Sequence, residues 1–332
     1  MRKTVLSFGE TLWDLLPSGP ALGGAPLNFA CRMHSLGDRC VMVTRLGRDD
    51  YGRKALERLA ESGMDTAHVQ HDQDHPTGTV QVTLDDKGNP DFFIVPDVAY
   101  DFIELTDKLL ESAAHADCFC YGTLAQRAPT SRLALHRLLE AAGKGVKFLD
   151  INLRNDCFFR ETITASLKQA NILKMNLPEA HFLAELFEIS ISSLADFCAE
   201  MIEEWSLSCC VVTLAEHGAF AASSEGKKAY VAGYEVAVAD TCGSGDAFSA
   251  GFIHEHLRGK SLADCCQLGV ALGAMVAGQS GATTPISIEQ IQQFLAAERR
   301  RIREPSLKPY EVSCSSSKGT TSTDRKGAES NK

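Results

Sequence analysis

The sequence lacks the motifs of several common enzyme classes. Its 332 residues contain no G-x-x-x-x-G-K-[ST] run, no G-x-G-x-x-G run and no G-x-S-x-G run. These absences exclude an ordinary P-loop, an ordinary dinucleotide-binding fingerprint and the nucleophile elbow of serine hydrolases. The longest apolar stretch, residues 268–278, falls far short of the roughly 20 residues that a membrane-spanning helix needs.

Signatures of metal binding and of disulfide frameworks are also missing, although the chain has 12 cysteines. No C-x-x-C occurs, and most cysteines lie in apolar segments, where cysteine behaves as a small hydrophobic residue. His254 and His256 flank Glu255, but residues two apart on a helix lie on different flanks, so this is not an H-E-x-x-H site. The N-terminus lacks the apolar run of a secretory signal. We therefore expect free thiols in a reducing cytoplasm and no membrane segment.

Positive charge is scarce over most of the chain. Lys and Arg number 33 against 43 Asp and Glu, a net charge of -10. Residues 299–332 hold nine basic and four acidic residues, so residues 1–298 carry -15. This balance argues against a nucleic-acid or anionic-membrane partner, because either would need a basic surface. An anion bound by the body of the protein must be held by a local device.

The order of apolar segments predicts an α/β fold. The predicted strands are 5–9, 40–46, 117–121, 146–151, 172–175 and 209–214, and helices such as 52–62, 131–142 and 193–205 lie between them. Strands that alternate with helices indicate a mostly parallel central sheet covered on both faces, a three-layer domain that we assign to residues 1–305. The binding crevice of such a sheet lies at the carboxyl ends of its strands.

Two segments break this alternation. Residues 10–25 and 77–97 read as short strands and turns with no helix signal, and residues 85–89 have the composition of a hairpin turn. They predict a small antiparallel sheet that projects from the domain as a lid, with one face to bury against substrate or a partner subunit. Residues 306–332 are rich in Ser, Thr and Lys, and we expect a disordered tail there.

The segment 240–252, DTCGSGDAFSAGF, carries the clearest chemical signal. Gly243 and Gly245 flank Ser244, and an apolar helical pattern follows. Small residues at a helix start leave backbone N–H groups unshielded, and the helix dipole adds positive potential, so this is a candidate anion site. Asp246 stands in the first turn. It is either a favourable dipole partner and cap, or a general base beside the anion; spacing alone leaves both open.

A second glycine-rich element spans residues 23–30, GGAPLNFA. Two glycines allow a ligand close to the backbone, Pro26 can open a helix, and Asn28 then offers an amide that suits a vicinal diol. The alternative is an ordinary junction between a loop and a helix. Asp14, upstream in the predicted lid, is either a sugar-hydroxyl acceptor or an exposed carboxylate.

These two elements, in this order and at this separation, resemble the two signatures of the ribokinase (PfkB-type) carbohydrate kinase family. The resemblance covers about residues 3–300. Further segments resemble the fructokinase branch: 76–80, 89–94, 98–101, 122–127, 150–154, 174–179 and 280–283. The resemblance implies a ribokinase-like domain with a β-sheet lid, and an ATP-dependent kinase for a sugar hydroxyl, with fructose as the substrate.

The resemblance also implies roles for individual residues. Asp246 matches the general base, and the backbone of residues 243–245 matches the anion hole. Substrate-binding positions match Asp14, Gly24, Asn28, Thr123 and Arg154. Nucleotide-binding positions match Asn176, Thr213, Gly218, Gly243 and Gly245. Glu179 matches a position that organises Mg²⁺, largely through water, and Asp240 with residues 276–285 resembles a site for a monovalent cation such as K⁺.

Some positions depart from the family pattern. Ala215 stands where many members have a glycine in the nucleotide loop, and the helix at 265–278 lacks an asparagine found near the adenine. Arg154 is either a substrate or phosphate contact or a structural ion-pair partner. Ribose, 2-keto-3-deoxygluconate or a nucleoside are alternative substrates, and a non-catalytic sugar-binding scaffold is an alternative function. A homodimer formed through the lid is also expected from the resemblance.

Overall fold

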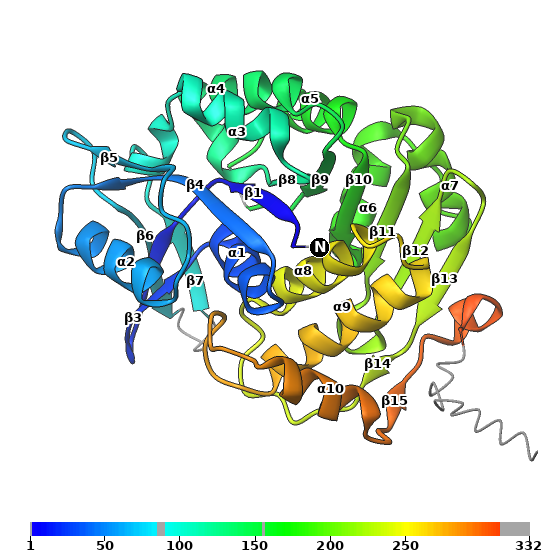
Figure 1. Cartoon of the computed structure of the whole chain (residues 1–332). Helices are drawn as coiled ribbons and strands as arrows, with labels where there is room; N and C mark the ends of the chain where they lie inside the picture. The colour runs from blue at the N-terminus through cyan, green and yellow to red at the C-terminus, as the bar shows by residue number, and fades with distance from the viewer. Residues whose placement is uncertain (1, 85–89, 155–156, 313–332) are drawn as a thin grey trace, which may run out of the picture.

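The computed structural model describes residues 2–84, 90–154 and 157–312. A nine-stranded sheet runs through the centre of this part of the chain in the order β13-β12-β11-β10-β9-β8-β1-β4-β5 (Figure 1). Its strands are β1 (Thr4–Phe8), β4 (Arg39–Gly47), β5 (Val69–Asp72), β8 (Cys118–Tyr121), β9 (Val146–Asp150), β10 (Ile172–Asn176), β11 (Cys209–Thr213), β12 (Ala219–Ser223) and β13 (Lys228–Val231).

The sheet is parallel from β11 to β5 and antiparallel only at the β11–β12–β13 edge. The predicted mostly parallel sheet is therefore confirmed. Successive residues of its strands serve two cores, because side chains alternate between the faces of a strand. In β1, Val5 belongs to one apolar cluster and Leu6 to the other, and both are fully buried.

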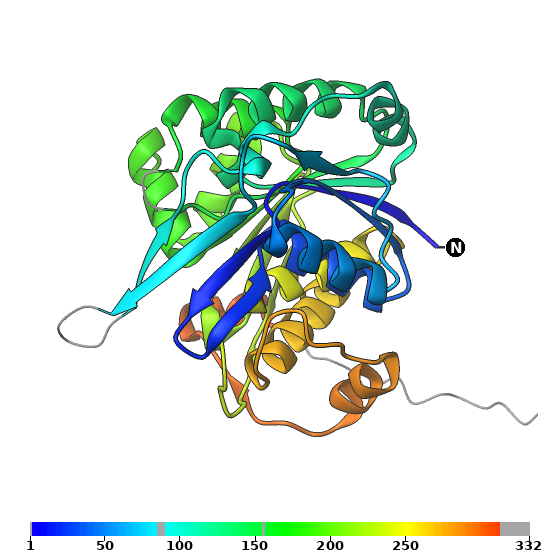
Figure 2. The same cartoon turned by 90° about the vertical axis from the view of Figure 1, so that its left-hand side faces the viewer.

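Helices cover both faces of the sheet, which completes the three layers (Figures 1 and 2). One face carries α1 (Ala25–Ser35), α8 (Ser244–His256), α9 (Leu262–Ala277) and α10 (Ile288–Ala296). The other carries α3 (Asp107–His115), α4 (Pro129–Ala141), α5 (Arg160–Gln169), α6 (Leu177–Phe187) and α7 (Leu194–Trp205). Helix α2 (Asp50–Glu61) lies near the β4–β5 edge. Within the described residues, no helix is both long and apolar enough to span a membrane.

The predicted lid is a separate four-stranded sheet in the order β3-β2-β6-β7, which projects from the domain (Figure 2). Its strands are β2 (Leu12–Leu16), β3 (Gly19–Gly23), β6 (Gly78–Leu84) and β7 (Pro90–Ile94). Each hairpin is antiparallel, and the two hairpins meet through a parallel β2–β6 pair. The turn expected at 85–89 lies outside the described residues.

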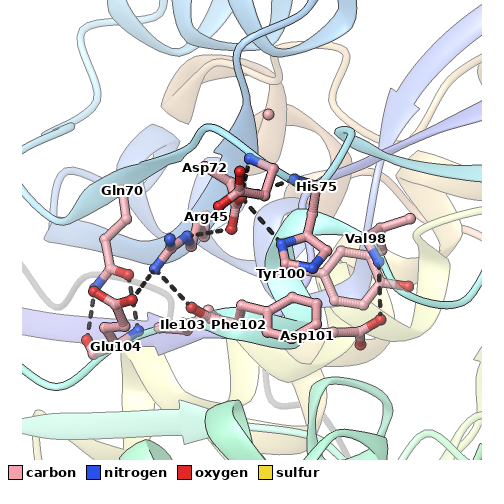
Figure 3. Close-up of polar contacts among 12 residues, drawn as sticks. Arg45, Gln70, Asp72, His75, Val98, Tyr100, Asp101, Phe102, Ile103 and Glu104 are labelled. Carbon is pink, nitrogen blue, oxygen red and sulfur yellow. Dashed lines mark hydrogen bonds and ion pairs between the residues drawn. The ribbon is translucent and has the colours of Figure 1, made fainter.

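The connection that enters the lid from β5 is tied to the main domain by two carboxylates. Asp72 pairs with Arg45 at 2.7 Å and with the His75 ring at 3.1 Å, and Arg45 also reaches Glu104 at 2.8 Å (Figure 3). Asp49 accepts the backbone N–H of Thr77 at 2.7 Å. Since β6 begins at Gly78, these contacts fix the base of the lid and leave the rest of it to project.

The C-terminal boundary of the domain differs from the prediction. Residues 305–310 form a short 3₁₀ helix, in which the Leu307 side chain is buried, and Val312 donates its N–H to Tyr230 O of β13. The predicted disordered tail is therefore wrong for residues 306–312, because the apolar side chain of Leu307 and the Tyr310 ring have a hydrophobic surface to cover. The remaining tail residues, 313–332, lie outside the described residues. Two further short strands, β14 (Gly233–Tyr234) and β15 (Arg301–Ile302), pair nearby.

Candidate active site

The N-terminus of α8 has the form of an anion site. Gly243 is its N-cap in the left-handed conformation, with φ 77°, and no side chain caps the helix. First-turn N–H groups of a helix lack intrahelical partners, and the dipole makes this end positive. The Ser244 N–H is already donated to Thr241 O at 3.2 Å, whereas the Ser244 hydroxyl is buried without a partner among the described residues. The positive helix end, rather than the Ser244 amide, therefore forms the core of the site.

Both glycines of this turn are required by close neighbours. A Cβ on Gly243 would lie 2.9 Å from the Cα of Ala282 and closer still to its Cβ. A Cβ on Gly245 would lie 3.4 Å from the Lys174 ammonium. The loop containing Ala282 therefore backs the anion site on one side, and a buried cation lies beneath it on another.

Asp246 is brought to Asn28 although the two residues are far apart in the sequence. The Asn28 amide donates to Asp246 Oδ2 at 2.8 Å. Burial, followed by the charge of Asp150, raises the Asp246 pKa to about 6. The carboxylate is therefore mostly ionised at pH 7 yet close to the pH at which it takes up a proton. Asn28 Oδ1 is buried without a partner among the described residues, which leaves an acceptor for a ligand hydroxyl.

A buried polar network that the sequence analysis missed supports this centre. Lys174 on β10 donates to Asp150 Oδ1 at 3.0 Å, and the hydroxyl of Ser249 on α8 donates to Asp150 Oδ2 at 2.6 Å. The charges of Asp150, Glu179 and Asp246 act together to raise the Lys174 pKa against the opposing effect of burial. The only advance signal was polarity: Asp150 and Lys174 are charged residues in apolar strands.

Glu10 is a second residue that the sequence analysis passed over. It follows β1, is buried, and accepts the N–H of Ala25 at the start of α1 at 3.2 Å. Burial raises its pKa to about 7. Glu10 and Asp150 line a cavity of about 20 Å³, a volume that is large enough for one water molecule. Its carbonyl lies so near Gly24 that a Cβ there would approach it to 2.5 Å, which explains the glycine.

The lid places Asp14 over the same region. A Cβ on Gly23 would lie 2.9 Å from Asp14 Oδ2, so the small residue lets the carboxylate approach the glycine-rich turn. Burial raises the Asp14 pKa, while the charge of Arg154 lowers it. Arg154 also lowers the pKa of Asp246 and of Glu10. Its own side chain is exposed, so its charge is available at the mouth of the site.

Thr123 lines the small cavity beside Glu10 but is engaged within the protein. Its side chain is buried and donates to Ile151 O at 2.9 Å, which ties the end of β8 to the end of β9. This bond accounts for a hydroxyl residue at the position without any ligand. The structure thus gives Thr123 a structural contact, and its substrate role stays a prediction.

Asn176 and Glu179 form a reciprocal cap at the start of α6. Asn176 Oδ1 accepts from Glu179 N at 2.8 Å, and Glu179 Oε2 accepts from Asn176 N at 2.7 Å. Glu179 Oε1 accepts from Leu153 N at 2.9 Å. Each carboxylate oxygen therefore already has a protein donor. Among the described residues, no three His, Cys, Asp or Glu side chains gather closely enough to hold a metal ion.

The predicted nucleotide residues lie at the adjoining end of the sheet. Thr213, at the end of β11, donates its hydroxyl to Met175 O at 3.3 Å. Gly218, with φ 93°, passes so close to the backbone of Val231 that only glycine fits. Ala215, which replaces a glycine of the family pattern, has a positive φ of 50°. The glycine preference at 215 is thus a backbone requirement, because left-handed φ is unfavourable for alanine.

Asp240 joins two loops next to the anion site. Its carboxylate accepts the N–H of Cys242 at 2.9 Å and the N–H of Gly281 at 3.3 Å. A carboxylate among backbone carbonyls is the oxygen donor set that hard cations take. The arrangement is therefore compatible with a monovalent cation, and it also has a purely structural function.

A family model now decides the class of protein. The model of the pfkB family carbohydrate kinases matches residues 20–289. The chain belongs to the pfkB family of carbohydrate kinases. It is therefore a phosphotransferase with an alcohol group as acceptor. The match spans both glycine-rich elements and the lid, so the predicted family is confirmed.

Named relatives of this pfkB-family kinase agree with the family model. Fructokinase-1 of Zea mays is 28% identical over 317 residues, which cover 87% of this chain and 96% of the relative. The fructokinase of Escherichia coli is 30% identical and covers 76% of this chain and 84% of its own. A solved structure of a Vibrio cholerae fructokinase double mutant, bound to fructose, ADP and potassium, superposes with a TM-score of 0.75 at 24% identity, over 88% of this chain and 98% of the other. The ribokinase-like fold is thereby confirmed.

Proposed function

We propose that this kinase transfers the γ-phosphate of ATP to a primary hydroxyl of fructose, with Asp246 as the general base. One observation carries the proposal: a carboxylate with a pKa of about 6 stands in the first turn of an uncapped helix, held by the amide of Asn28. An anion site and a base in one turn match phosphoryl transfer, which needs positioning and charge stabilisation more than covalent help.

The proton and electron balance follows from this placement. Asp246 accepts the hydroxyl proton as the sugar oxygen forms its bond to the γ-phosphorus and the bond from that phosphorus to the bridging oxygen of ADP breaks. Asn28 keeps the Asp246 carboxylate oriented because its amide binds one oxygen and leaves the other for the substrate. The α8 dipole stabilises the negative charge on the transferring oxygens.

The buried network beneath the site supports the same reaction. Lys174 holds Asp150, and its charge lowers the pKa of Asp246 against the raising effect of burial and of Asp150. Without this cation, Asp246 would be protonated over more of the neutral range and could not act as a base. Lys174 therefore sets the pH window in which the base operates.

The sugar is proposed to lie between the lid and α1. Asp14 supplies a carboxylate from the lid, Asn28 Oδ1 supplies a buried acceptor, and Gly24 permits close approach to the backbone. Closure of the lid over the sugar would exclude water, which limits wasteful hydrolysis of ATP. Arg154, exposed beside these carboxylates, is proposed to contact substrate or phosphate.

Mg²⁺ accompanies ATP in this proposal. Asn176 and Glu179 fit the ion through intervening water, because their side chains already cap α6 and Mg²⁺ dehydrates reluctantly. When bound, the ion neutralises phosphate charge. Thr213 and Gly218, at the end of the same sheet region, are proposed to line the nucleotide site.

The choice of fructose rests on the relatives. The maize and E. coli proteins are named fructokinases, and the V. cholerae structure contains fructose, ADP and potassium. We also propose a cytoplasmic location, since the described cysteines are free thiols and such thiols fit a reducing compartment. Domain limits of 1–312 fit the folded segment better than 1–305.

A homodimer through the lid is a further proposal. The lid is a small projecting sheet, and Phe93 on β7 is 56% exposed. A second copy of the lid would cover such a surface. Sedimentation of the wild type and of Phe93→Glu tests this, because a dimer that dissociates in the variant alone is expected.

The test of the function is coupled ADP release. Fructose, ribose, 2-keto-3-deoxygluconate and adenosine are each supplied with ATP and Mg²⁺, with and without K⁺. We expect fructose to give the highest kcat/KM. A higher value for another compound would replace fructose as the substrate, and no ADP release with any sugar would favour a non-catalytic sugar-binding protein.

A further inference from the structure

Arg32 on α1 is a buried charge without a counter-ion. Its side chain is 2% exposed, and among the described residues no carboxylate lies within ion-pair distance of it. Burial of an unpaired charge is costly, so other groups must compensate. Burial lowers the Arg32 pKa to about 10, and the guanidinium therefore stays protonated at neutral pH.

The compensating groups are backbone carbonyls of a single loop. Arg32 Nη2 donates to Thr284 O at 3.1 Å and to Ala282 O at 3.4 Å. The Arg32 Nε atom is buried without a hydrogen-bond partner in the described part of the chain. A cation held by carbonyl oxygens alone resembles a cation-binding site in which the protein supplies its own ion.

This loop lies directly behind the anion site. Ala282 contacts Gly243 so closely that a Cβ on Gly243 could not be accommodated. The preceding Gly281 donates its N–H to Asp240, and Asp240 also accepts from Cys242 in the turn before α8. The position of residues 281–284 therefore determines where the α8 N-terminus can lie.

One face of α1 serves both sides of the site. Asn28 and Arg32 are four residues apart, so they lie one above the other on the helix. Asn28 reaches Asp246 at 2.8 Å, and Arg32 reaches the loop that backs Gly243. A single rigid element thus holds the base and the buttress of the anion site in register.

We propose that Arg32 is a built-in cation that holds the 281–284 loop and thereby positions the anion site of α8. It is a positioning residue, since it acts through Ala282 and Gly243. The proposal rests on the phosphoryl-transfer function proposed above. Asp240 and the neighbouring carbonyls fit a monovalent cation as well, but Arg32 makes the position of the loop largely independent of one.

Three variants test the proposal. Arg32→Ala removes the charge and opens a space for free guanidinium, Arg32→Lys keeps the charge, and Arg258→Ala is the matched control. Arg258 is also a partly buried arginine, but it pairs with Asp38 at 2.7 Å near the far end of α8. Melting temperature is measured without substrates in K⁺, in tetramethylammonium and with millimolar guanidinium, and kcat and KM are measured in the same salts.

The wild type is expected to melt at the same temperature in K⁺ and tetramethylammonium, and to change kcat less than about twofold between them. Arg32→Ala is expected to lose at least about tenfold in kcat in tetramethylammonium, with smaller changes in KM. Guanidinium should raise both its melting temperature and its kcat. Arg32→Lys should keep kcat within about threefold of the wild type.

Several results would overturn the proposal. These are an Arg32→Ala kcat within twofold of the wild type, a lack of guanidinium rescue, equal rescue of Arg258→Ala, and an Arg32→Lys variant as impaired as Arg32→Ala. If Arg32→Ala does not fold, Arg32→Lys decides: it must remain insensitive to the choice of monovalent cation. Absence of activity with every sugar would refute the proposed function instead, and the melting temperatures would still decide the role of Arg32.

Discussion

Asn28 and Asp246 are 218 residues apart in the sequence and are joined by a 2.8 Å hydrogen bond from the amide to the carboxylate. This bond links the first glycine-rich element to the second. It also brings together helices α1 and α8, which lie side by side on one face of the sheet (Figure 1). The candidate active site is therefore built from the two N-termini of adjacent helices.

Asp246→Asn is expected to lower kcat by about 10²- to 10⁴-fold, because the amide cannot accept the hydroxyl proton. Affinity for sugar and ATP should persist, since Asn retains an acceptor for Asn28. Coupled ADP release and calorimetry measure the two effects. Asp50→Asn, at an exposed carboxylate on α2, is the control and should be silent. Turnover within about tenfold of wild type would remove Asp246 as the base.

The pH profile should carry the signature of Asp246. Its pKa of about 6 predicts that kcat falls as the pH drops through 6, because the base becomes protonated. Lys174 lowers this pKa, so Lys174→Met should move the acid limb to higher pH. The same variant leaves Asp150 buried without its partner, and we expect a loss of about 3 kcal/mol in stability. A variant with an unmoved acid limb would refute the electrostatic role of Lys174.

Glu10 predicts an effect on stability that needs no substrate. Its pKa is raised from 4.5 to about 7 in the folded protein, so the folded state binds this proton more tightly than the unfolded state. The favourable contribution is fully present below pH 4.5 and is lost as the pH rises through 7. Glu10→Gln should flatten this decline in the free energy of unfolding, measured by urea titration between pH 5 and 8.5. An equal decline in both proteins would contradict the prediction.

Asp14→Ala is expected to raise KM for the sugar by at least about tenfold through the loss of a charge-assisted hydrogen bond. KM for ATP should hardly change, because Asp14 lies in the lid above the glycine-rich turn. Calorimetry with the sugar alone gives the binding effect directly. Asp91→Ala, on the neighbouring strand β7, provides a comparison within the lid. Unchanged sugar affinity would take Asp14 out of the site.

Gly243→Ala should reduce kcat and stability together. The added Cβ meets Ala282, and the left-handed φ of 77° disfavours alanine by about 1–2 kcal/mol. The double variant Gly243→Ala/Ala282→Gly removes the collision but keeps the unfavourable φ. Thermal denaturation should therefore show partial recovery in the double variant. Full recovery would mean that φ has no cost, and no recovery would mean that Ala282 is not the obstacle.

Much of the fold could be predicted because it rests on local patterns. β1, β4 and β8 to β11 coincide with the apolar runs to within a residue or two. These strands are buried on both faces, so their hydrophobic runs are continuous and easily seen. The tail boundary was misplaced since Leu307 is a single apolar residue in a polar segment, and its packing surface on β13 comes from elsewhere in the chain.

The sequence by itself determined the two glycine-rich turns, the alternation of strands and helices, and the candidate base Asp246. These depend on backbone requirements and periodicities that are local to each segment. Only the tertiary structure decided the partners: Lys174 beneath Gly245, Glu10 against Gly24, and Arg32 in the carbonyls behind Gly243. A buried charge takes its cost, its pKa and its function from groups that are distant in sequence, and these become neighbours only when the chain folds.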